Sequence, residues 1–197
     1  MRAKKSASSK SSGFIRIISG KWRGRKLPVI DSEGLRPTTD RTKETLFNWL
    51  MQDVVDAQCL DVFAGSGSLG LEALSRYAKS VTLIEKQKDI AAALNKIKAL
   101  LQASDSELTV VNQDAVAWLK QCRGSYNLVF IDPPFKKNLL QPVIDTLLSQ
   151  NLLQDGALLY IEHEIELDWQ LPPQLVEIKR KSTRQVCSLL VQFQAQE

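Results

Sequence analysis

The sequence predicts an α/β fold in which a mostly parallel sheet of seven strands is covered by helices on both faces. From residue 58 onward, short apolar runs alternate with helical segments, and this alternation is typical of parallel sheets. The run Leu128-Val129-Phe130-Ile131 is apolar without interruption, as expected for a strand buried on both faces. The last two apolar runs, over 175–181 and 185–193, predict a hairpin, so the sheet should be mixed.

A smaller unit is expected ahead of the sheet. Residues 14–18 and 25–29 predict the two strands of a hairpin, with Ser19-Gly20 at its turn. Glycine and proline predict a loop over 31–39. A helix should follow over about 40–51, because Thr and Asp at its start are good capping residues and its apolar residues fall on one face.

The alternation that follows predicts five strands and four helices before the closing hairpin. The expected strands cover residues 59–63, 80–85, 108–112, 126–132 and 157–162. The expected helices cover about 68–78, 87–102, 113–122 and 138–149. We therefore divide the chain into a disordered basic tail over 1–13, a basic hairpin and helix over 14–53, and a main domain over 54–197.

The charge of the chain is unevenly distributed. The 197 residues contain 26 Lys/Arg and 22 Asp/Glu, but residues 1–43 hold twelve of the basic residues and three of the acidic ones. A basic segment of this kind points to a polyanionic partner. For the first twelve residues we favour a solvated, disordered tail instead, because Ser and Lys dominate there and no apolar residue anchors them.

Cysteine and histidine usage excludes two classes of site. Cys59, Cys122 and Cys187 are far apart and form no C-x-x-C pair, and His163 is the single histidine. We therefore expect neither a disulfide framework nor a zinc site, and no metal at all, with Cys59 and Cys187 in the core. Because no apolar run approaches the roughly 20 residues of a membrane span, we expect a cytoplasmic protein without membrane contact.

Residues 60–70, LDVFAGSGSLG, predict a strand, a glycine-rich turn and the start of a helix. The G-x-G-x-x-G spacing lets the backbone approach a ligand closely, although it also marks dinucleotide enzymes. Glu85 ends the next strand, where its carboxylate can accept ribose hydroxyls. Asp114 follows the third strand, where it can meet an adenine amino group or simply be a solvated strand end. The residues expected to bind the cofactor are Asp61, Phe63, Gly65, Ser66, Gly67, Gly70, Glu85 and Asp114.

Asp61 discriminates between cofactors. It ends the first strand of the alternation, four residues before Gly65. An anion at this place suits the ammonium of a methionine moiety, whereas it is unfavourable beside a dinucleotide pyrophosphate. Asp61 can also hydrogen-bond loop amides. The pattern therefore favours S-adenosylmethionine.

The catalytic residues are expected in Asp132-Pro133-Pro134-Phe135, directly after the fourth strand. At the point where strand order reverses, this segment should lie beside the glycine turn. Asp132 and the Pro133 carbonyl can accept both hydrogens of an exocyclic amine on a nucleic-acid base, and Phe135 can stack on that base. The amine is then held with its lone pair toward the methyl sulfonium. By itself, Asp-Pro-Pro is also a natural strand-ending loop.

Several stretches together are similar to the bacterial small-subunit ribosomal RNA guanine-N2 methyltransferases, the RsmD family. Residues 15–27, IRIISGKWRGRKL, resemble the basic hairpin of that family, and 35–48, with LRPTTDR and ETLFN, resemble its second signature. Residues 61–72 and 132–135 resemble its cofactor and catalytic motifs. Only the second signature is specific to this family.

The resemblance implies a Rossmann-like class I methyltransferase fold and transfer of a methyl group from S-adenosylmethionine to a guanine N2 in 16S ribosomal RNA. It implies that the RNA is presented by the small ribosomal subunit or an assembly intermediate. We expect the enzyme to act as a monomer. The residues expected to contact RNA are Arg16, Lys21, Arg23, Arg25 and Lys26, which should form a basic face beside the active site together with Arg36, Arg41 and Lys43. Alternatively, some of them only solvate the fold, and Arg36 or Arg41 braces the cofactor pocket.

Three other functions are compatible with parts of the pattern. A DNA adenine-N6 methyltransferase fits the Asp132–Phe135 site, since nothing in it names guanine. A nucleotide-cofactor oxidoreductase fits the glycine spacing alone. A non-catalytic RNA-binding module fits the basic hairpin, but it does not account for the polar groups of both motifs.

Overall fold

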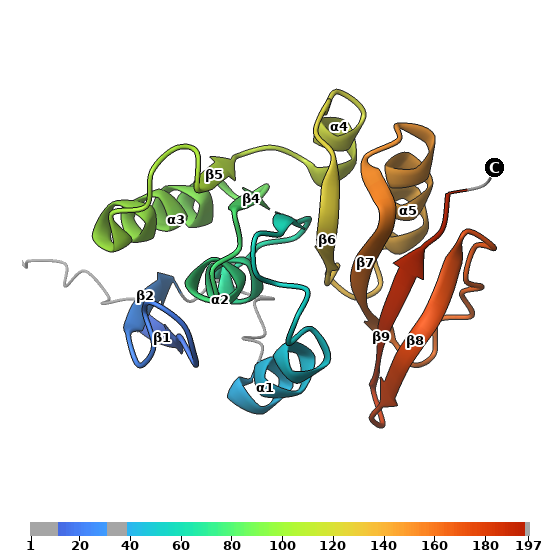
Figure 1. Cartoon of the computed structure of the whole chain (residues 1–197), viewed down its shortest axis with the longest axis horizontal. Helices are drawn as coiled ribbons and strands as arrows, with labels where there is room; N and C mark the ends of the chain where they lie inside the picture. The colour runs from blue at the N-terminus through green and yellow to red at the C-terminus, as the bar shows by residue number, and fades with distance from the viewer. Residues whose placement is uncertain (1–11, 31–38, 196–197) are drawn as a thin grey trace, which may run out of the picture.

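In the computed structural model, residues 12–30 and 39–195 are described (Figure 1). Residues 31–38 of the loop expected over 31–39, and residues 1–11 of the tail expected over 1–13, lie outside these ranges. Ser12 and Gly13, which we assigned to the tail, already belong to a strand.

A seven-stranded mixed sheet forms the centre of the protein, with strand order β5-β4-β3-β6-β7-β9-β8. β3 to β7 pair in parallel, whereas β9 is antiparallel to both β7 and β8, as the terminal hairpin predicted. The strands are β3 (Gln58–Asp61), β4 (Ser80–Ile84), β5 (Leu108–Val111), β6 (Tyr126–Ile131), β7 (Leu153–Glu164), β8 (Leu175–Ser182) and β9 (Val186–Phe193). β7 begins four residues earlier than expected.

Helices cover both faces, and the side chains of β6 show why its sequence is apolar throughout. Leu128 and Phe130 join the core under α1, α2 and α3, while Val129 and Ile131 join the core under α4 and α5. The helices are α1 (Asp40–Trp49), α2 (Ser68–Ser75), α3 (Lys88–Leu101), α4 (Ala115–Leu119) and α5 (Leu140–Ser149). Thr39 caps α1 by accepting a hydrogen bond from the amide of Thr42. Cys59 and Cys187 are buried in the two cores, as expected.

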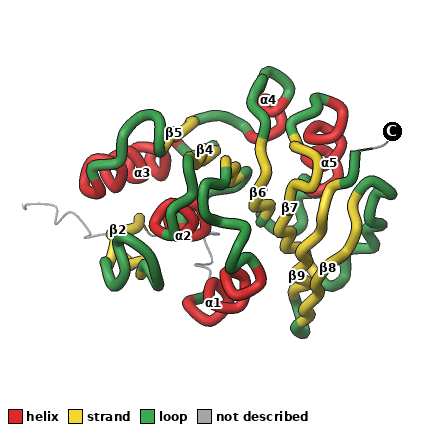
Figure 2. Tube along the Cα trace, viewed as in Figure 1, coloured by secondary structure: helices red, strands yellow, loops and turns green. Residues whose placement is uncertain are grey.

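The basic hairpin is a separate two-stranded sheet of β1 (Ser12–Arg16) and β2 (Lys26–Ile30). Figure 2 shows α2 between this hairpin and the main sheet. Gly20, with φ of 82°, lies so close to the last turn of α2 that a Cβ atom there would be 1.7 Å from the Ser75 carbonyl oxygen. The hairpin turn is therefore docked against the C-terminal end of α2.

The parallel strands give the sheet two chemically different edges. We call the edge at which β3, β4, β6 and β7 end the carboxyl edge, and the opposite one the amino edge. In open α/β sheets, ligands bind at the carboxyl edge where strand order reverses. Here the order reverses between β3 and β6, because β4 and β5 follow on one side of β3 and β6 and β7 follow on the other. Across residues 12–30 and 39–195, the structure has no helix of sufficient length and apolarity to span a bilayer.

Candidate functional site

The glycine turn joins the carboxyl end of β3 to α2. Gly67 has φ of 77°, a left-handed conformation that glycine adopts without strain, and it precedes the first residue of α2. At Gly70, a Cβ atom would lie 2.4 Å from Leu83 and 2.9 Å from Val81 of β4. The third glycine of the motif thus allows α2 to pack directly on the sheet, which leaves the first turn of the helix at the carboxyl edge.

Asp61 is a buried carboxyl group beneath this turn. Its side chain is 3% exposed and accepts a hydrogen bond from the amide of Gly70 at 3.1 Å. Burial raises the pKa of Asp61 to about 7, because the charged form loses hydration, and the amide of Gly70 offsets only part of this effect. Asp61 therefore does bond to loop amides, and its predicted contact with an ammonium group remains a prediction.

Glu85 connects the glycine turn to the end of β4. One carboxylate oxygen accepts the amide of Gly65 at 3.0 Å, and the other accepts the amide of Gln87 at 2.6 Å. Asn112, which the sequence did not single out, donates to the carbonyl of Glu85 at 2.9 Å. Each carboxylate oxygen has a second lone pair, so the predicted contact with ribose hydroxyls is compatible with this arrangement.

Asp114 caps the N-terminus of α4. It accepts the amide of Ala117 at 3.2 Å and pairs with Lys86 at 3.1 Å. The amide of Ala117 and the ammonium of Lys86 hold the pKa of Asp114 below its usual range. Asp114 therefore caps α4, a role that we did not expect from the sequence, and adenine recognition stays a prediction.

An orphaned polar atom supports a ligand at this turn. Ser68, the first residue of α2, is 4% exposed, and its hydroxyl is the one buried side-chain N or O atom within residues 12–30 and 39–195 that lacks a hydrogen-bond partner. Buried hydroxyl groups nearly always have partners. Together with the amides at the start of α2, this hydroxyl makes the turn suitable for a polar cofactor such as S-adenosylmethionine.

The segment Asp132–Phe135 lies next to the glycine turn. Asp61 pairs with Phe130 in the sheet, and the amide of Val62 donates to the Phe130 carbonyl at 3.0 Å. Asp132 follows two residues later at the carboxyl edge. It is half-buried and close enough to Tyr160 to contribute, after burial and Glu162, to the raised pKa of that phenol. The glycine turn and the segment Asp132–Phe135 thus lie side by side at the carboxyl edge, and their roles in cofactor binding and catalysis stay predictions.

The rest of the catalytic segment is held by its neighbours. Pro133 is buried and Phe135 is half-buried. The amide of Lys136 donates to the carboxylate of Glu164 on β7 at 2.6 Å. Glu164 was not singled out from the sequence, because its place beside the catalytic segment depends on the pairing of β6 with β7.

The predicted RNA-contact residues Arg16, Lys21, Arg23, Arg25 and Lys26 are all exposed. However, the hairpin turn that carries three of them does not lie at the carboxyl edge. The amides of Lys21 and Trp22 donate to Ser75 at the far end of α2, and Lys21 pairs with Glu107 at 2.8 Å, next to the start of β5. The expectation of a basic face beside the active site is therefore wrong for this turn, whereas the end of β2 does reach the glycine turn, because Val29 and Ile30 line a small pocket with Gly65 and Ser66.

Lys43 requires a second correction. We included it in the basic face, but it is 1% exposed and donates to the carbonyl of Arg16. It lies 3.9 Å from the carboxylate of Glu72, which is completely buried. Lys43 is thus an internal partner of Glu72, whereas Arg41 is exposed and Arg36 lies outside the described residues.

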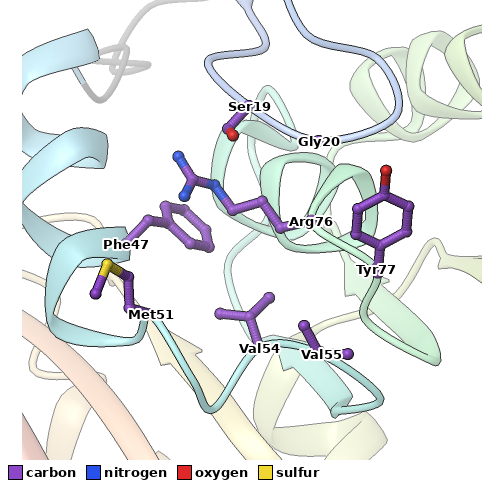
Figure 3. A pocket seen from close by; sticks show the side chains of 8 residues that line it. All are labelled: Ser19, Gly20, Phe47, Met51, Val54, Val55, Arg76 and Tyr77. Atoms are coloured by element: carbon purple, nitrogen blue, oxygen red, sulfur yellow. The ribbon is translucent and has the colours of Figure 1, made fainter.

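One cavity lies away from this site. A pocket of about 150 Å³ lies at the amino edge, between the hairpin turn, the end of α1 and the end of α2 (Figure 3). Its lining residues are Ser19, Gly20, Phe47, Met51, Val54, Val55, Arg76 and Tyr77. Arg76 lies over the ring of Phe47 at 4.7 Å and bonds to Glu72, so the charged group of the pocket is already engaged.

Comparisons with known proteins agree with this geometry. The family model described as conserved hypothetical protein 95 matches residues 15–192. The chain is 52% identical over 186 residues to the ribosomal RNA small subunit methyltransferase D of Escherichia coli (strain K12), covering 94% of this chain and 93% of that protein. It is 48% identical to the protein of the same name from Haemophilus influenzae, covering 91% of this chain and 94% of that protein.

The fold comparison leads to the same group. The solved structure of the Escherichia coli protein yhhF superimposes with a TM-score of 0.86 at 50% identity, covering 93% of this chain and all of that one. The matches extend over both the hairpin and the main sheet, and they include the glycine turn and the Asp132 segment. This chain is therefore a methyltransferase that belongs to the family of the ribosomal RNA small subunit methyltransferase D proteins.

Proposed function

We propose that this protein transfers a methyl group from S-adenosylmethionine to the exocyclic N2 amine of a specific guanine in 16S ribosomal RNA, presented in the small ribosomal subunit or an assembly intermediate. The observation that carries the proposal is the position of Asp132-Pro133-Pro134-Phe135 beside the glycine turn, at the carboxyl edge of adjacent strands. The relatives act on ribosomal RNA according to their names, and this supports the substrate class.

The cofactor would be held by the residues around the turn. The first amides of α2 and the Ser68 hydroxyl provide donors, Asp61 provides a carboxylate for the ammonium group, and Glu85 provides one for the ribose. When bound, S-adenosylmethionine supplies an electrophilic methyl group on a sulfonium. Because Glu85 is fixed between Gly65 and Gln87, its acceptor atoms are preorganised and cost little ordering on binding.

The catalytic segment acts on the acceptor base. Asp132 and the Pro133 carbonyl accept the two hydrogens of the exocyclic amine, which turns the nitrogen lone pair toward the methyl group. Phe135 stacks on the base and fixes its plane. Buried Pro133 and the Lys136–Glu164 hydrogen bond keep this short loop rigid, so the acceptors stay aligned during transfer. A paired base cannot reach such a site, so the target must be looped or flipped out.

The substitution Asp132→Asn tests this assignment. It keeps the shape of the side chain but replaces one acceptor oxygen with a donor, so we expect turnover on small-subunit particles to fall by about a hundredfold or more, at the lower end of the losses caused by removing one preorganised polar group. Cofactor affinity should stay within about twofold of wild type. Asp53→Asn, an exposed residue before β3, is the matched control.

Analysis of the modified nucleoside identifies the product. N2-methylguanosine in 16S RNA is expected, and full activity of the Asp132→Asn variant would contradict the catalytic assignment. Methyladenine formed in DNA, with unmodified 16S RNA, would overturn the substrate while leaving a methyltransferase.

A further inference from the structure

β8 is a basic strand on the open edge of the sheet, outside the segments considered above. All its residues after Leu175 are exposed, and the segment from Lys179 to Arg184 carries four basic side chains among six residues. It has β9 as its only neighbour in the sheet, so one side of the strand has no strand partner among the described residues. Edge strands are commonly prevented from pairing with other chains by charged side chains, and the lysines of β8 provide such charges. The arrangement of the lysines, however, is not that of a simple protective edge.

A β-bulge turns two of these lysines toward one face. Glu177 pairs with Val191, but Lys179 pairs with Leu190, so one extra residue is inserted between them. Without the bulge, Lys179 would be opposite Leu189, whose side chain lies in the core under α4 and α5. With it, Lys179 and Lys181 fall on the face of Leu190, which is the face of α1 and α2. Bulges commonly re-aim side chains next to active sites.

This face also carries the catalytic carboxylate. Lys181 pairs with Ser188, and Ser188 pairs with Glu162 of β7. Because Ile161 pairs with Ile131, Glu162 is level with Asp132. Three strand spacings separate β6 from β8, so the backbone of Lys181 is about 14 Å from that of Asp132. The side chain of Lys181 points toward α1, where its ammonium donates to the hydroxyl of Thr45 at 3.2 Å.

The turn between β8 and β9 is at the carboxyl edge. Val186 pairs with Glu164, the residue that holds the catalytic segment through the amide of Lys136. Arg184, at the tip of this turn, is exposed and therefore adds to the same edge. Arg180 does not, because it faces the other side and pairs with Glu177 at 2.6 Å. The basic residues that the β8–β9 hairpin contributes on this side are thus Lys179, Lys181 and Arg184.

We propose that the surface formed by Lys179, Lys181 and Arg184 binds RNA phosphates that flank the target base, so that the substrate RNA is held on the β8 side of Asp132. The N-terminal hairpin lies at the opposite end of the molecule from β8 (Figure 1) and its turn is at the amino edge. A polyanion is the partner that this surface fits, because Lys179, Lys181 and Arg184 are exposed cations and the single acidic residue of β8, Glu177, is turned away. The inference rests on the proposed function, since it assigns the substrate's docking place at that site.

The test compares two variants that lose the same charge. Lys179→Gln/Lys181→Gln removes two cations from the proposed surface, and Lys79→Gln/Lys120→Gln removes two exposed cations near the amino edge. Binding of a labelled 16S ribosomal RNA transcript is measured across salt concentrations. If each lysine neutralises one phosphate of a single-stranded segment, the slope of log K against log salt should become shallower by about 1.4 in the first variant and stay unchanged in the second.

Turnover separates docking from structure. The first variant should raise KM for RNA several-fold while leaving kcat at saturating RNA and the thermal shift by S-adenosylmethionine unchanged. Lys179→Arg/Lys181→Arg, which keeps the charge, should restore the wild-type slope. A wild-type slope in the Gln variant, or an equal change in the amino-edge variant, overturns the proposal.

The experiments distinguish an error in the proposed function from an error in the docking surface. If the wild-type protein methylates no RNA, the proposed function fails, and the salt slopes still decide whether these lysines bind RNA. If it methylates RNA and the Gln variant behaves like the amino-edge variant, only the docking surface fails. Tighter, lysine-dependent binding of a duplex DNA of matched length would overturn RNA as the occupant.

Discussion

Asp61 shows how one buried side chain can connect protonation with ligand binding. Its pKa is about 7 because burial disfavours the carboxylate, although the amide of Gly70 partly offsets this. The unfolded value is near 4, so the raised pKa contributes stability to the cofactor-free protein below pH 4, and this contribution is lost as the pH rises from about 4 to about 7. A ligand that brings an ammonium group to Asp61 favours the ionised carboxylate over the protonated form.

We therefore predict that S-adenosylmethionine binds more tightly as the pH rises from 5.5 to 7. Below its pKa, Asp61 must release a proton to pair with the ammonium, so the affinity should increase by up to about tenfold per pH unit. Isothermal titration in buffers of different ionisation enthalpy would detect the proton released on binding.

The matched comparison is Asp61→Asn, which can still accept the amide of Gly70 but cannot ionise. Its affinity for the cofactor should be lower and independent of pH over the same range. Methylthioadenosine, which lacks the amino-acid part, should bind the wild-type protein without this dependence. If methylthioadenosine shows the same dependence as S-adenosylmethionine, Asp61 does not pair with the ammonium.

At the residue scale, the sequence predicted which carboxylates lie at the carboxyl edge but not which groups they bond to. Asp61 ends a strand, and Glu85 and Asp132 follow directly after strands, so their places at the carboxyl edge follow from the alternation alone. Their hydrogen-bond partners depend on loop conformation, which has no periodic signal. Asp114 illustrates this, because the same Asp can cap α4 or meet an adenine without any change in the sequence pattern.

Among the elements, α2 connects the glycine turn at its N-terminal end with the basic hairpin that packs on its later residues. Its first turn forms the glycine loop, and its later residues hold the basic hairpin. Buried Glu72 accepts the amides of Ile18 and Ser19 at 2.8 and 3.0 Å, and also pairs with Arg76 at 2.8 Å and with Lys43 at 3.9 Å. Burial lowers the pKa of Lys43, and Glu72 partly offsets this.

Replacing Glu72 with Gln should reduce the free energy of unfolding by about 3–5 kcal/mol, because Lys43 would lose its buried compensating charge and keep only the half-exposed Asp40 at 3.8 Å. Urea denaturation measures this loss. Adding Lys43→Met to the same protein should recover a large part of it, since the uncompensated charge is then removed. A loss below about 1 kcal/mol in the Glu72→Gln variant would mean that the pair has little energetic weight.

The hairpin shows what periodicity cannot predict about elements. Its strands and its turn were expected within about two residues of their observed bounds. Its docking direction was not, because that depends on long-range contacts such as the close approach of Gly20 to Ser75. The burial of Lys43 was missed for the same reason, since lysine in an amphipathic helix is normally exposed.

At the scale of the whole molecule, strand order decides which residues meet at the catalytic edge. The sequence predicted a mixed sheet of seven strands, and the structure has one. The insertion of β9 between β7 and β8 follows from the antiparallel hairpin, yet the bulge after Glu177 has no clear sequence signal. Thus the charge of β8 was visible in the sequence, whereas the face to which its lysines point was not.

Binding at the carboxyl edge should also stabilise the molecule as a whole. The site joins the ends of β3 and β4 to α2, and a ligand that binds only the native state raises its stability by mass action. At a hundred times its Kd, S-adenosylmethionine should add about 2.7 kcal/mol, which for a chain of this size raises Tm by about 5–10 °C. Differential scanning calorimetry measures the shift.

Glu85→Ala should affect two quantities at once. The amides of Gly65 and Gln87 lose their acceptor, so the cofactor-free protein should lose about 1–3 kcal/mol of stability. The increase of Tm on adding S-adenosylmethionine should also be smaller, because the acceptor for the ribose is gone. Asp53→Asn should change neither quantity. A lower starting Tm with an undiminished shift would mean that Glu85 only supports the glycine turn and does not touch the cofactor.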